Sequence, residues 1–390
     1  MQLAGGFGLP SAGPLDGRIE DSFTRQLEAM PAQTRRLVQL ASADPFGDAA
    51  LVWRAAGRLG IGLEAAPPAA GLAEFSARVR FRHPLVRSAA YRSASISAMR
   101  EMHGALAEAT DPGIDPDRRA WHRARAVPGP DEDVAAELER SAGRAQARGG
   151  LAAAAAFLER AALLTPEPDR RARRMLAAAR AMREAGAAEA ALGLLAQAAA
   201  GPPDELQAAQ MEYLRGQVAY DQRRGYDAVR LLLSAARLLE PLNSALAREA
   251  YLEALTAAVF VGEEFSPGGM REAAEAARAA PPAAAAPRPA DVVLDAYTLL
   301  LTEGYVVAGP ALRRALDVLV ALDTGTSDGR RWLFLAGGRA GITIAMDLCD
   351  WESMQILAAG QAQAARDVGA LVPARCLPTM RPATWSRSSS

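Results

Sequence analysis

Three stretches of this chain repeat one spacing of small and apolar residues, and the repetition limits the folds that the chain can adopt. In each repeat two helical patterns meet at a turn, and the repeat lengths are 37 and 38 residues. Small residues stand where two antiparallel helices would touch, and a proline closes the second helix. This spacing predicts an all-α-dominant chain with tetratricopeptide-like helix pairs in a solenoid. The three copies are Gly149, Leu151, Ala154, Leu158, Ala161 and Pro166; Gly186, Ala188, Ala191, Leu195, Ala198 and Pro203; and Arg224 in place of glycine, then Tyr226, Val229, Leu233, Ala236 and Pro241.

Looser copies extend the pattern toward the C-terminus. Further helix pairs are expected at 246–260 with 270–280, at 291–302 with 311–322 and at 332–348 with 351–368. A unit of this kind cannot bury its apolar face alone, so the repeats over 131–368 are expected to stack on their neighbours. Many contact positions are alanine, which allows close approach but adds little buried area, so the larger apolar side chains should dominate stability.

A different pattern precedes the repeats, over residues 18–126. Apolar residues at helical spacing predict three short helices, over Arg18–Met30, around Leu37–Leu40 and over Leu51–Leu59. The period then changes to that of a strand in Arg78–His83, where arginines alternate with apolar residues. Pro84 suits the first turn of a following helix. Three helices, a hairpin and a helix describe a winged-helix-like module, followed by connecting helices.

The two connecting elements each carry one of the three histidines of the chain, His103 in the first and His122 in the second. A helix with Ile96, Met99, Met102 and Leu106 on one side is expected first, and a segment with Trp121 and His122 leads toward the repeats. The Pro- and Gly-rich residues 127–130 form a short boundary.

The charge balance gives no overall signal for a nucleic-acid or membrane partner, although it does not exclude a local basic patch. All 44 basic residues are arginine, and 45 acidic residues bring the net charge to -1, so nothing global indicates nucleic acid or an anionic membrane.

The two cysteines, Cys349 and Cys376, are too few for a disulfide framework or a metal knuckle, which favours a reducing, cytoplasmic compartment. The start lacks the pattern of a secretion signal. No apolar run reaches the length of a membrane span, about 18 residues.

A search for catalytic motifs gives no candidate. The sequence has no G-x-x-x-x-G-K-[ST] loop and no G-x-S-x-G elbow, and His83, His103 and His122 have no cysteine or histidine at metal-ligand spacing. Carboxylates such as Glu159, Glu184 and Glu189 fit solvent-facing sides of helices. No enzyme activity, metal or cofactor is therefore expected of this chain.

One local concentration of charge stands out between Arg78 and Arg100, with six arginines and no acidic residue. The strand end and the helix start could meet phosphate groups of a nucleotide or of DNA, with Arg82 and His83 as the candidate contacts. In the alternative interpretation the arginines form the exposed face of a wing, and His83 is partly buried at the strand end.

The segment FRHPLVRSAAY at residues 81–91, with Met102–Ala107, Trp121-His122 and LERSAGRAQARGGLAAAAAFLERAALLTP at 138–166, resembles the large ATP-binding LuxR-type transcriptional regulators of high-GC bacteria. The resemblance covers Leu3 to about Leu371. It implies a signal-transducing ATPase in which an AAA-like P-loop module is followed by a winged-helix lid, tetratricopeptide-like repeats and a helix-turn-helix. It also implies that a lid histidine approaches the nucleotide phosphates, and His83 matches its place.

The resemblance implies that this chain holds the lid at 18–126 and the repeats at 131–368. Residues 1–17 are expected to be disordered or a remnant of the ATPase module, and 369–390 a disordered tail, as in a chain cut or frame-shifted at both ends. ATP or ADP is implied for the family and not for this chain. A protein or small-molecule inducer is implied as the partner of the repeats, and DNA only through the C-terminal domain. The alternative is a free-standing tetratricopeptide scaffold that binds a protein segment.

Overall fold

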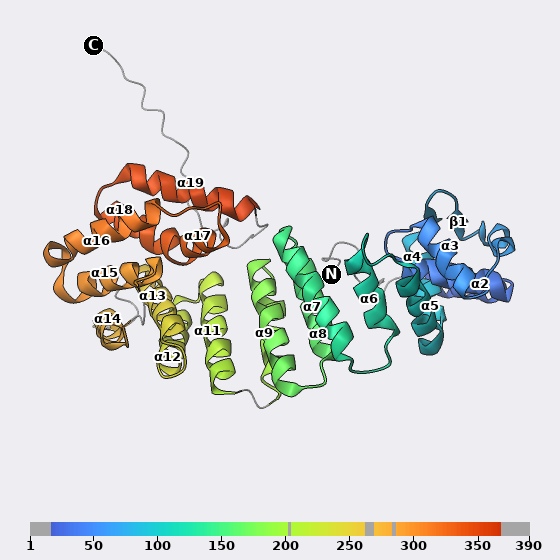
Figure 1. Cartoon of the computed structure of the whole chain (residues 1–390), viewed down its shortest axis with the longest axis horizontal. Helices are drawn as coiled ribbons and strands as arrows, with labels where there is room; N and C mark the ends of the chain where they lie inside the picture. Colours follow the sequence, from blue (N-terminus) through green and yellow to red (C-terminus); the bar gives the residue numbers. More distant parts are fainter. Residues whose placement is uncertain (1–16, 202–203, 262–268, 283–285, 368–390) are drawn as a thin grey trace, which may run out of the picture. The chain divides into compact units, whose positions relative to one another are not determined.

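The structure is a computed structural model that describes residues 17–201, 204–261, 269–282 and 286–367. The chain divides into two compact units, Met1–Ala178 and Ala179–Ser390. Both are mainly helical, and the described residues contain one two-stranded sheet, so the predicted all-α-dominant composition is confirmed (Figure 1). The predictions for Pro203 and for the chain ends, apart from Gly17, lie outside the described residues. None of the described helices combines the length and the apolar character that crossing a membrane requires.

The first unit begins with three helices and a hairpin, as predicted. Val79 points into the core with 7% of its surface exposed, and the neighbouring Arg80 is exposed. Strand β1 pairs antiparallel with β2, with Glu74 opposite Arg80. The elements are α1 (Gly17–Glu28), α2 (Ala32–Ala43), α3 (Ala49–Arg58), two 3₁₀ turns (Leu63–Ala65 and Pro67–Ala69), β1 (Ala73–Phe75) and β2 (Val79–Phe81).

Five further helices complete the part of the first unit that carries the candidate sites. In α5, Met102 and Leu106 are fully buried against α2 and α3, as the spacing predicted. The predicted helix begins at Ile96, and this residue is 75% exposed because it precedes the part of the helix that packs. These helices are α4 (Pro84–Ser93), α5 (Ile96–Ala109), α6 (Pro116–Ala126), α7 (Glu132–Ala147) and α8 (Leu151–Leu164); α9 (Pro168–Glu184) follows.

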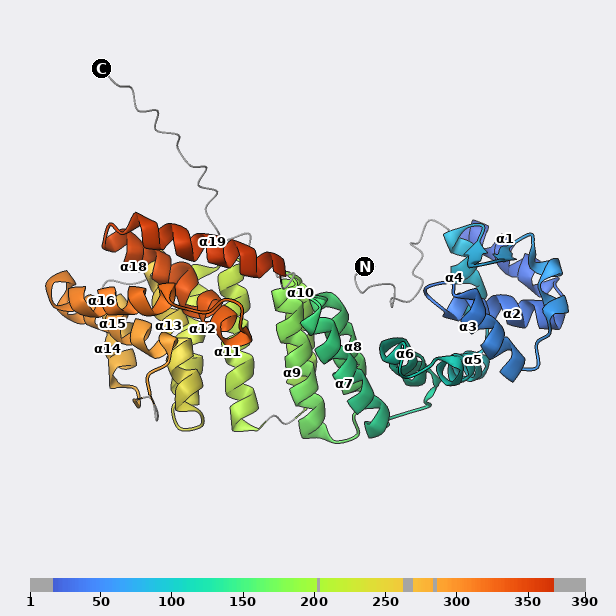
Figure 2. The same ribbon diagram turned by 45° about the horizontal axis from the view of Figure 1, so that its top comes forward.

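Most helices of the second unit contribute to a hydrophobic cluster that begins in α11. Tyr251 and Tyr297 are its largest fully buried side chains, and alanines fill many of the positions between helices. Helices α11, α12 and α13 pack in sequence, each against the next (Figure 2). Its elements are α10 (Ala188–Ala198), α11 (Glu205–Asp221), α12 (Gly225–Leu239), α13 (Ser244–Val261), α14 (Gly269–Ala279), α15 (Pro289–Glu303), α16 (Tyr305–Val320), α17 (Ser327–Trp332), a π-helix (Leu333–Gly341), α18 (Ile342–Asp347) and α19 (Trp351–Asp367).

The turn inside each repeat is the same backbone structure three times. Gly149, Gly186 and Arg223 all have positive φ, at 76°, 80° and 60°. In each case the next amide bonds back to the helix, as in Gly150 N to Ala145 O at 2.8 Å and Arg224 N to Ala219 O at 2.9 Å. This pattern is a helix C-terminal motif that favours glycine. The turns are therefore spaced by 37 residues throughout, and the alignment that placed Arg224 opposite the glycines was wrong by one residue.

Replacing Arg223 with glycine is expected to raise the stability of this turn by about 1 kcal/mol, because an L side chain is strained in the left-handed region. Hydrogen exchange of the α11 and α12 amides should then slow by about fivefold, given RT near 0.6 kcal/mol. The matched control is Arg215→Gly within α11, which should speed exchange, since glycine destabilises a helix interior by about 1 kcal/mol. Faster exchange in Arg223→Gly would contradict the assignment of the turn.

The sixth predicted helix pair differs from a regular one. Residues 332–348 were predicted as one α-helix, but a π-helix occupies Leu333–Gly341 between α17 and α18. The buried Gln361 of α19 donates from Nε2 to the carbonyl of Leu333, the first residue of the π-helix, at 3.1 Å. Apolar spacing alone does not distinguish this helix from an α-helix.

Arginine–carboxylate pairs connect neighbouring elements in both units. Buried Arg118 of α6 donates from Nε to Asp44 at 3.0 Å, and buried Arg248 of α13 donates from Nε to Asp291 of α15 at 2.7 Å. Arg174 of α9 reaches Glu132 of α7 at 2.9 Å. A guanidinium offers several donors in one plane, so one arginine can bridge two carboxylates at once.

Candidate functional site

The predicted contacts Arg82 and His83 lie together at the end of β2 and the start of α4, and both are exposed. His83 is the N-cap of α4: its Nδ1 accepts a hydrogen bond from the Leu85 amide at 3.1 Å. Its ring stacks on Phe23 with 6.2 Å between the centroids. The alternative expectation of a partly buried His83 was wrong, because the ring caps the helix end from outside.

The backbone at this helix start has few donors left for a phosphate group. Pro84 has no amide hydrogen, the Leu85 amide is bound to the His83 ring, and the Val86 amide bonds to the His83 carbonyl at 3.0 Å. A phosphate here would depend on the guanidinium of Arg82 and the Nε2 atom of His83. With no P-loop in the sequence, these two residues do not make a complete nucleotide site.

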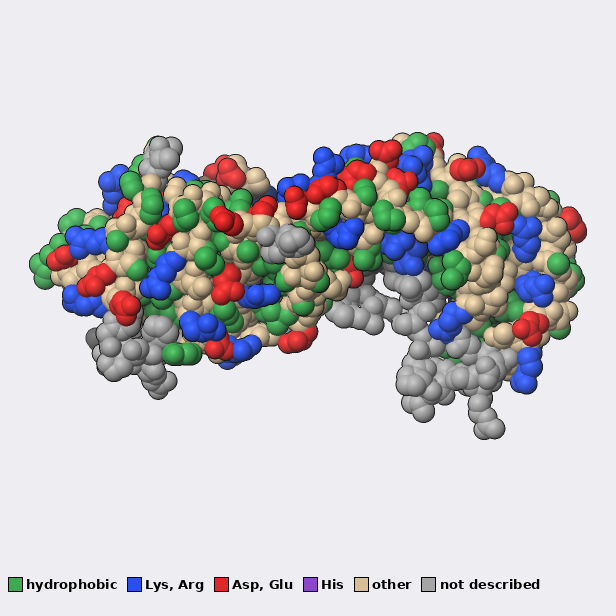
Figure 3. Space-filling model, turned by 90° about the horizontal axis from the view of Figure 1, so that it is seen from below, with side chains coloured by type: hydrophobic (Ala, Val, Ile, Leu, Met, Phe, Trp, Pro, Cys, Tyr) green, Lys and Arg blue, Asp and Glu red, His purple; other side chains and the backbone are tan. Residues whose placement is uncertain are grey.

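The six arginines between Arg78 and Arg100 do not form one surface. Arg78, Arg80 and Arg82 are exposed on the hairpin, whereas Arg87 donates from Nε to the Ser42 carbonyl at 3.0 Å. The remaining two, Arg92 and Arg100, line a pocket at the far end of α4. On the face displayed in Figure 3, arginine and acidic side chains are interspersed with hydrophobic ones.

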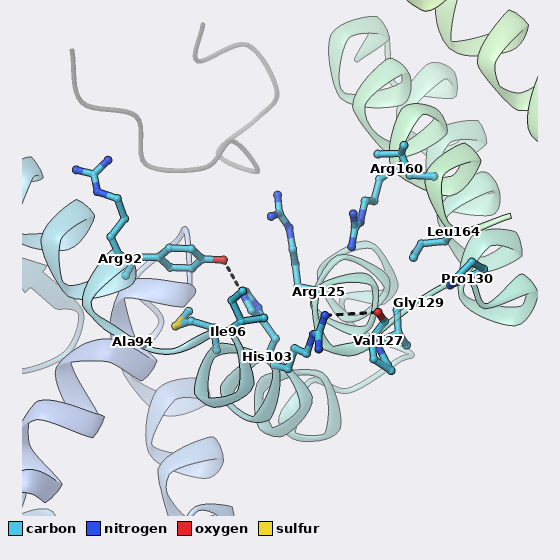
Figure 4. A pocket seen from close by; sticks show the side chains of 15 residues that line it. Arg92, Ala94, Ile96, His103, Arg125, Val127, Gly129, Pro130, Arg160 and Leu164 are labelled. Atoms are coloured by element: carbon cyan, nitrogen blue, oxygen red, sulfur yellow. Dashed lines mark hydrogen bonds between the residues drawn. The ribbon is translucent and has the colours of Figure 1, made fainter. Parts of the chain in front are cut away.

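This pocket has a volume of about 520 Å³ and lies within the first unit, among α4, α5, α6 and α8 and the segment 127–130 (Figure 4). It combines a basic set of side chains with an apolar set. The basic members are Arg92, Arg100, His103, Arg125 and Arg160, and the apolar side chains include Ile96, Met99, Val127, Leu163 and Leu164. None of its fifteen lining residues is acidic.

Neutral groups hold the central arginines in place. Arg125 lies over the ring of Trp121 with its guanidinium carbon 4.7 Å from the centroid. Arg160 donates from Nη2 to the Ala124 carbonyl at 2.7 Å, and its Nε atom is buried with no hydrogen-bond partner among the described residues. Arg100 donates to the Pro128 carbonyl at 3.4 Å. Within the described structure, no carboxylate forms an ion pair with Arg125 or Arg160.

The surroundings of this pair disfavour its positive charge. Burial lowers the pKa of the Arg125 guanidinium, and the nearby Tyr91 opposes that effect only in part. Burial and then repulsion from Arg125 lower the pKa of Arg160. Arginine nevertheless stays charged at neutral pH. The pocket therefore holds two neighbouring, partly desolvated cations without an anionic counter-charge.

Two buried histidines lie next to these cations. His103 Nε2 is 3.0 Å from the Tyr91 hydroxyl, and His103 Nδ1 is 2.9 Å from His122 Nδ1. The two facing nitrogens need exactly one proton between them, so at least one ring must be neutral. Burial, with repulsion from Arg125 and Arg160, lowers the pKa of His103 to about 3. Burial also lowers the pKa of His122 well below its usual value, and its Nε2 lacks a hydrogen-bond partner among the described residues.

Sequence reasoning missed this site. His103 and His122 are 19 residues apart on separate helices, a spacing typical of no metal motif, and Arg125 and Arg160 lie in different predicted modules. The packing of α5 against α6, and of α6 against α7 and α8, brings the four together. Within the described ranges, no group of three or more His, Cys, Asp or Glu residues could hold a metal ion.

Comparison with models of protein families, with curated proteins and with solved structures gave no match to this chain.

Proposed function

We propose that this chain is the winged-helix lid and sensor part of an ATP-dependent LuxR-type transcriptional regulator of the cytoplasm, in which the helix pairs form a tetratricopeptide-like solenoid that binds a signal or partner. The observation that carries the proposal is the order of elements: three helices, a hairpin and a helix, followed by helix pairs with the identical turn at residues 149, 186 and 223. The FRHPLVRSAAY segment, which carries the resemblance, runs from Phe81 at the end of β2 through the cap at His83 to Tyr91 in α4.

In this proposal the chain contributes no reaction step of its own. A signal bound by the repeats favours one of two arrangements of the lid, and the lid alters nucleotide exchange in a P-loop module. Arg82 and His83 are the residues that approach the phosphates. Both are exposed and adjacent, which supports a role at a contact with another module.

The alternative is a free-standing tetratricopeptide scaffold that binds a protein segment. The alanine-rich, closely packed helices α11, α12 and α13 support it equally, since a helical array needs no catalytic group to bind a peptide. The DNA on both sides of this reading frame discriminates the two. A P-loop sequence upstream and a helix-turn-helix downstream support the regulator, and the lack of both favours the scaffold.

In the gene product that includes the P-loop sequence, Arg82→Ala/His83→Ala is expected to weaken ADP binding by about tenfold, which corresponds to one lost charge-assisted hydrogen bond of about 1.4 kcal/mol. Isothermal titration calorimetry measures the change. Arg80→Ala, on the exposed side of β2, is the matched control and should leave ADP affinity unchanged. Equal ADP affinity in the double variant and the unchanged protein would contradict a phosphate role for this pair.

A further inference from the structure

We propose that the pocket lined by Arg100, His103, Arg125 and Arg160 binds a small organic anion with an apolar body. The inference concerns a site that the proposed function does not use, and it does not depend on that function. It starts from the unbalanced charge of the pocket: Arg125 and Arg160 repel one another, no lining residue is acidic, and their contacts are with an aromatic ring and a backbone carbonyl.

The donor geometry favours an anion over a neutral ligand. The unpartnered Nε of Arg160 is buried, and an unsatisfied donor in such a place costs free energy until an acceptor arrives. The Tyr91 hydroxyl is anchored by His103, which places a further polar group at the same pocket. In the view of Figure 4 the Arg125 side chain lies between those of Arg92 and Arg160. An anion beside Arg125 and Arg160 would relieve the repulsion between these two residues and accept hydrogen bonds from their guanidinium groups.

The rest of the lining argues for an apolar body on that anion. The volume of about 520 Å³ is far larger than an inorganic ion needs and falls in the range of small-molecule pockets, roughly 300–1,000 Å³. Ile96 and Leu163 are 75% and 52% exposed, and a bound ligand that covers them would remove apolar surface from water. Each methylene group of the ligand that is buried against these apolar side chains contributes to the free energy of binding.

The direct test is calorimetric titration of the full chain with three ligands: octanoate, its neutral analogue octanamide, and acetate. We expect octanoate to bind at least about tenfold more tightly than either of the others, because only octanoate has both the charge and the apolar body. Equal affinities for octanoate and octanamide would overturn the proposed role of the arginines. Equal affinities for octanoate and acetate would overturn the proposed apolar body, and no saturable octanoate binding up to about 10 mM would overturn the site itself.

Variants locate the binding. Arg125→Gln/Arg160→Gln should weaken octanoate binding by at least about tenfold, since it removes two charge-assisted contacts. Arg78→Gln/Arg80→Gln on the exposed hairpin changes the net charge equally and should leave the affinity unchanged. An unchanged affinity in the pocket variant, or an equal loss in both, would overturn the assignment.

A second substitution covers the case in which the double variant fails to fold. Leu163 lies one helical turn after Arg160 and is half-exposed, so Leu163→Glu places a competing carboxylate beside the guanidinium with little effect on the core. It should weaken octanoate binding by at least about threefold, whereas Leu163→Gln should keep affinity closer to that of the unchanged chain. Equal affinities in the two variants would count against an anion at Arg160.

Discussion

Replacing Arg118 with methionine is expected to lower the free energy of unfolding of the first unit by about 3–5 kcal/mol. The guanidinium donates from Nε to Asp44 at 3.0 Å and from Nη1 to Asp48 at 3.2 Å, and it covers the ring of Phe46 at 5.2 Å. The Asp44 side chain is fully buried and that of Arg118 is 8% exposed. Methionine keeps most of the volume but removes the guanidinium that hydrogen-bonds to this buried carboxylate, which is the costly situation, and Arg87 is then the positive charge that remains near Asp44.

Urea unfolding followed by fluorescence measures this effect. In a chain whose tryptophans at 332, 351 and 385 are replaced with phenylalanine, the remaining Trp53 and Trp121 both report on the first unit. The matched control is Arg119→Met on the same helix, which breaks a half-exposed pair with Glu137 and should cost about 1 kcal/mol or less. Arg118→Met/Asp44→Leu removes both charges and should recover most of the loss. An equal cost for Arg118→Met and Arg119→Met would contradict the role given to burial.

The first unit is also expected to lose stability between pH 6.5 and pH 4.5 through its buried histidines. Their folded-state pKa values are depressed, so the unfolded chain takes up protons below about pH 6.5 while the folded chain does not. Stability therefore falls as pH falls through this window. For His103, whose pKa is lowered to about 3, uptake of one proton by the unfolded chain over this window gives a loss of about 2 kcal/mol, and His122 adds to it.

The groups around the pair determine the sign. Arg125 and Arg160 face His103, Arg118 and Arg125 lie near His122, and the hydroxyl of Tyr91 is bonded to His103. None of these groups is acidic, so none favours a protonated imidazole. Carboxylates with lowered pKa, among them Asp48 and Asp117, add a loss in the same direction at lower pH, as the pH falls below 3.8.

The measurement is the same urea titration repeated between pH 7 and pH 4.5. His103→Gln/His122→Gln should be less stable at pH 7 but should show a flatter pH dependence over this range. His83→Gln, at an exposed position outside the pair, is the control for the general effect of replacing a histidine. A steep slope in the double variant would show that other groups take up the protons.

The sequence predicted helices well where apolar residues recurred at helical spacing and a proline or glycine marked the end of the helix. Pro84 marked the first turn of α4, and the glycines at 149 and 186 marked the breaks between paired helices. The prediction for Arg224 failed because a non-glycine residue, Arg223, adopts the left-handed conformation of the turn. The π-helix at Leu333–Gly341 was missed because the spacing of its apolar residues does not distinguish it from an α-helix.

The pocket could not be predicted for a related reason. His103, His122, Arg125 and Arg160 come from three helices, and none of them belongs to a motif of adjacent residues. The sequence predicted a site at Arg82 because arginines are concentrated in that part of the chain. In the folded chain the uncompensated charge lies at Arg125 and Arg160, because the absence of nearby carboxylates is a property of packing and not of composition.

The recurring turn at residues 149, 186 and 223 has a consequence for how the gene can change in length. Breakpoints with the same backbone geometry can be joined to one another, so a duplication or deletion between two of them adds or removes a whole block and restores an intact turn. Small insertions inside a helix instead rotate every later side chain out of register. Natural variants of this region should therefore differ by blocks of 37 residues.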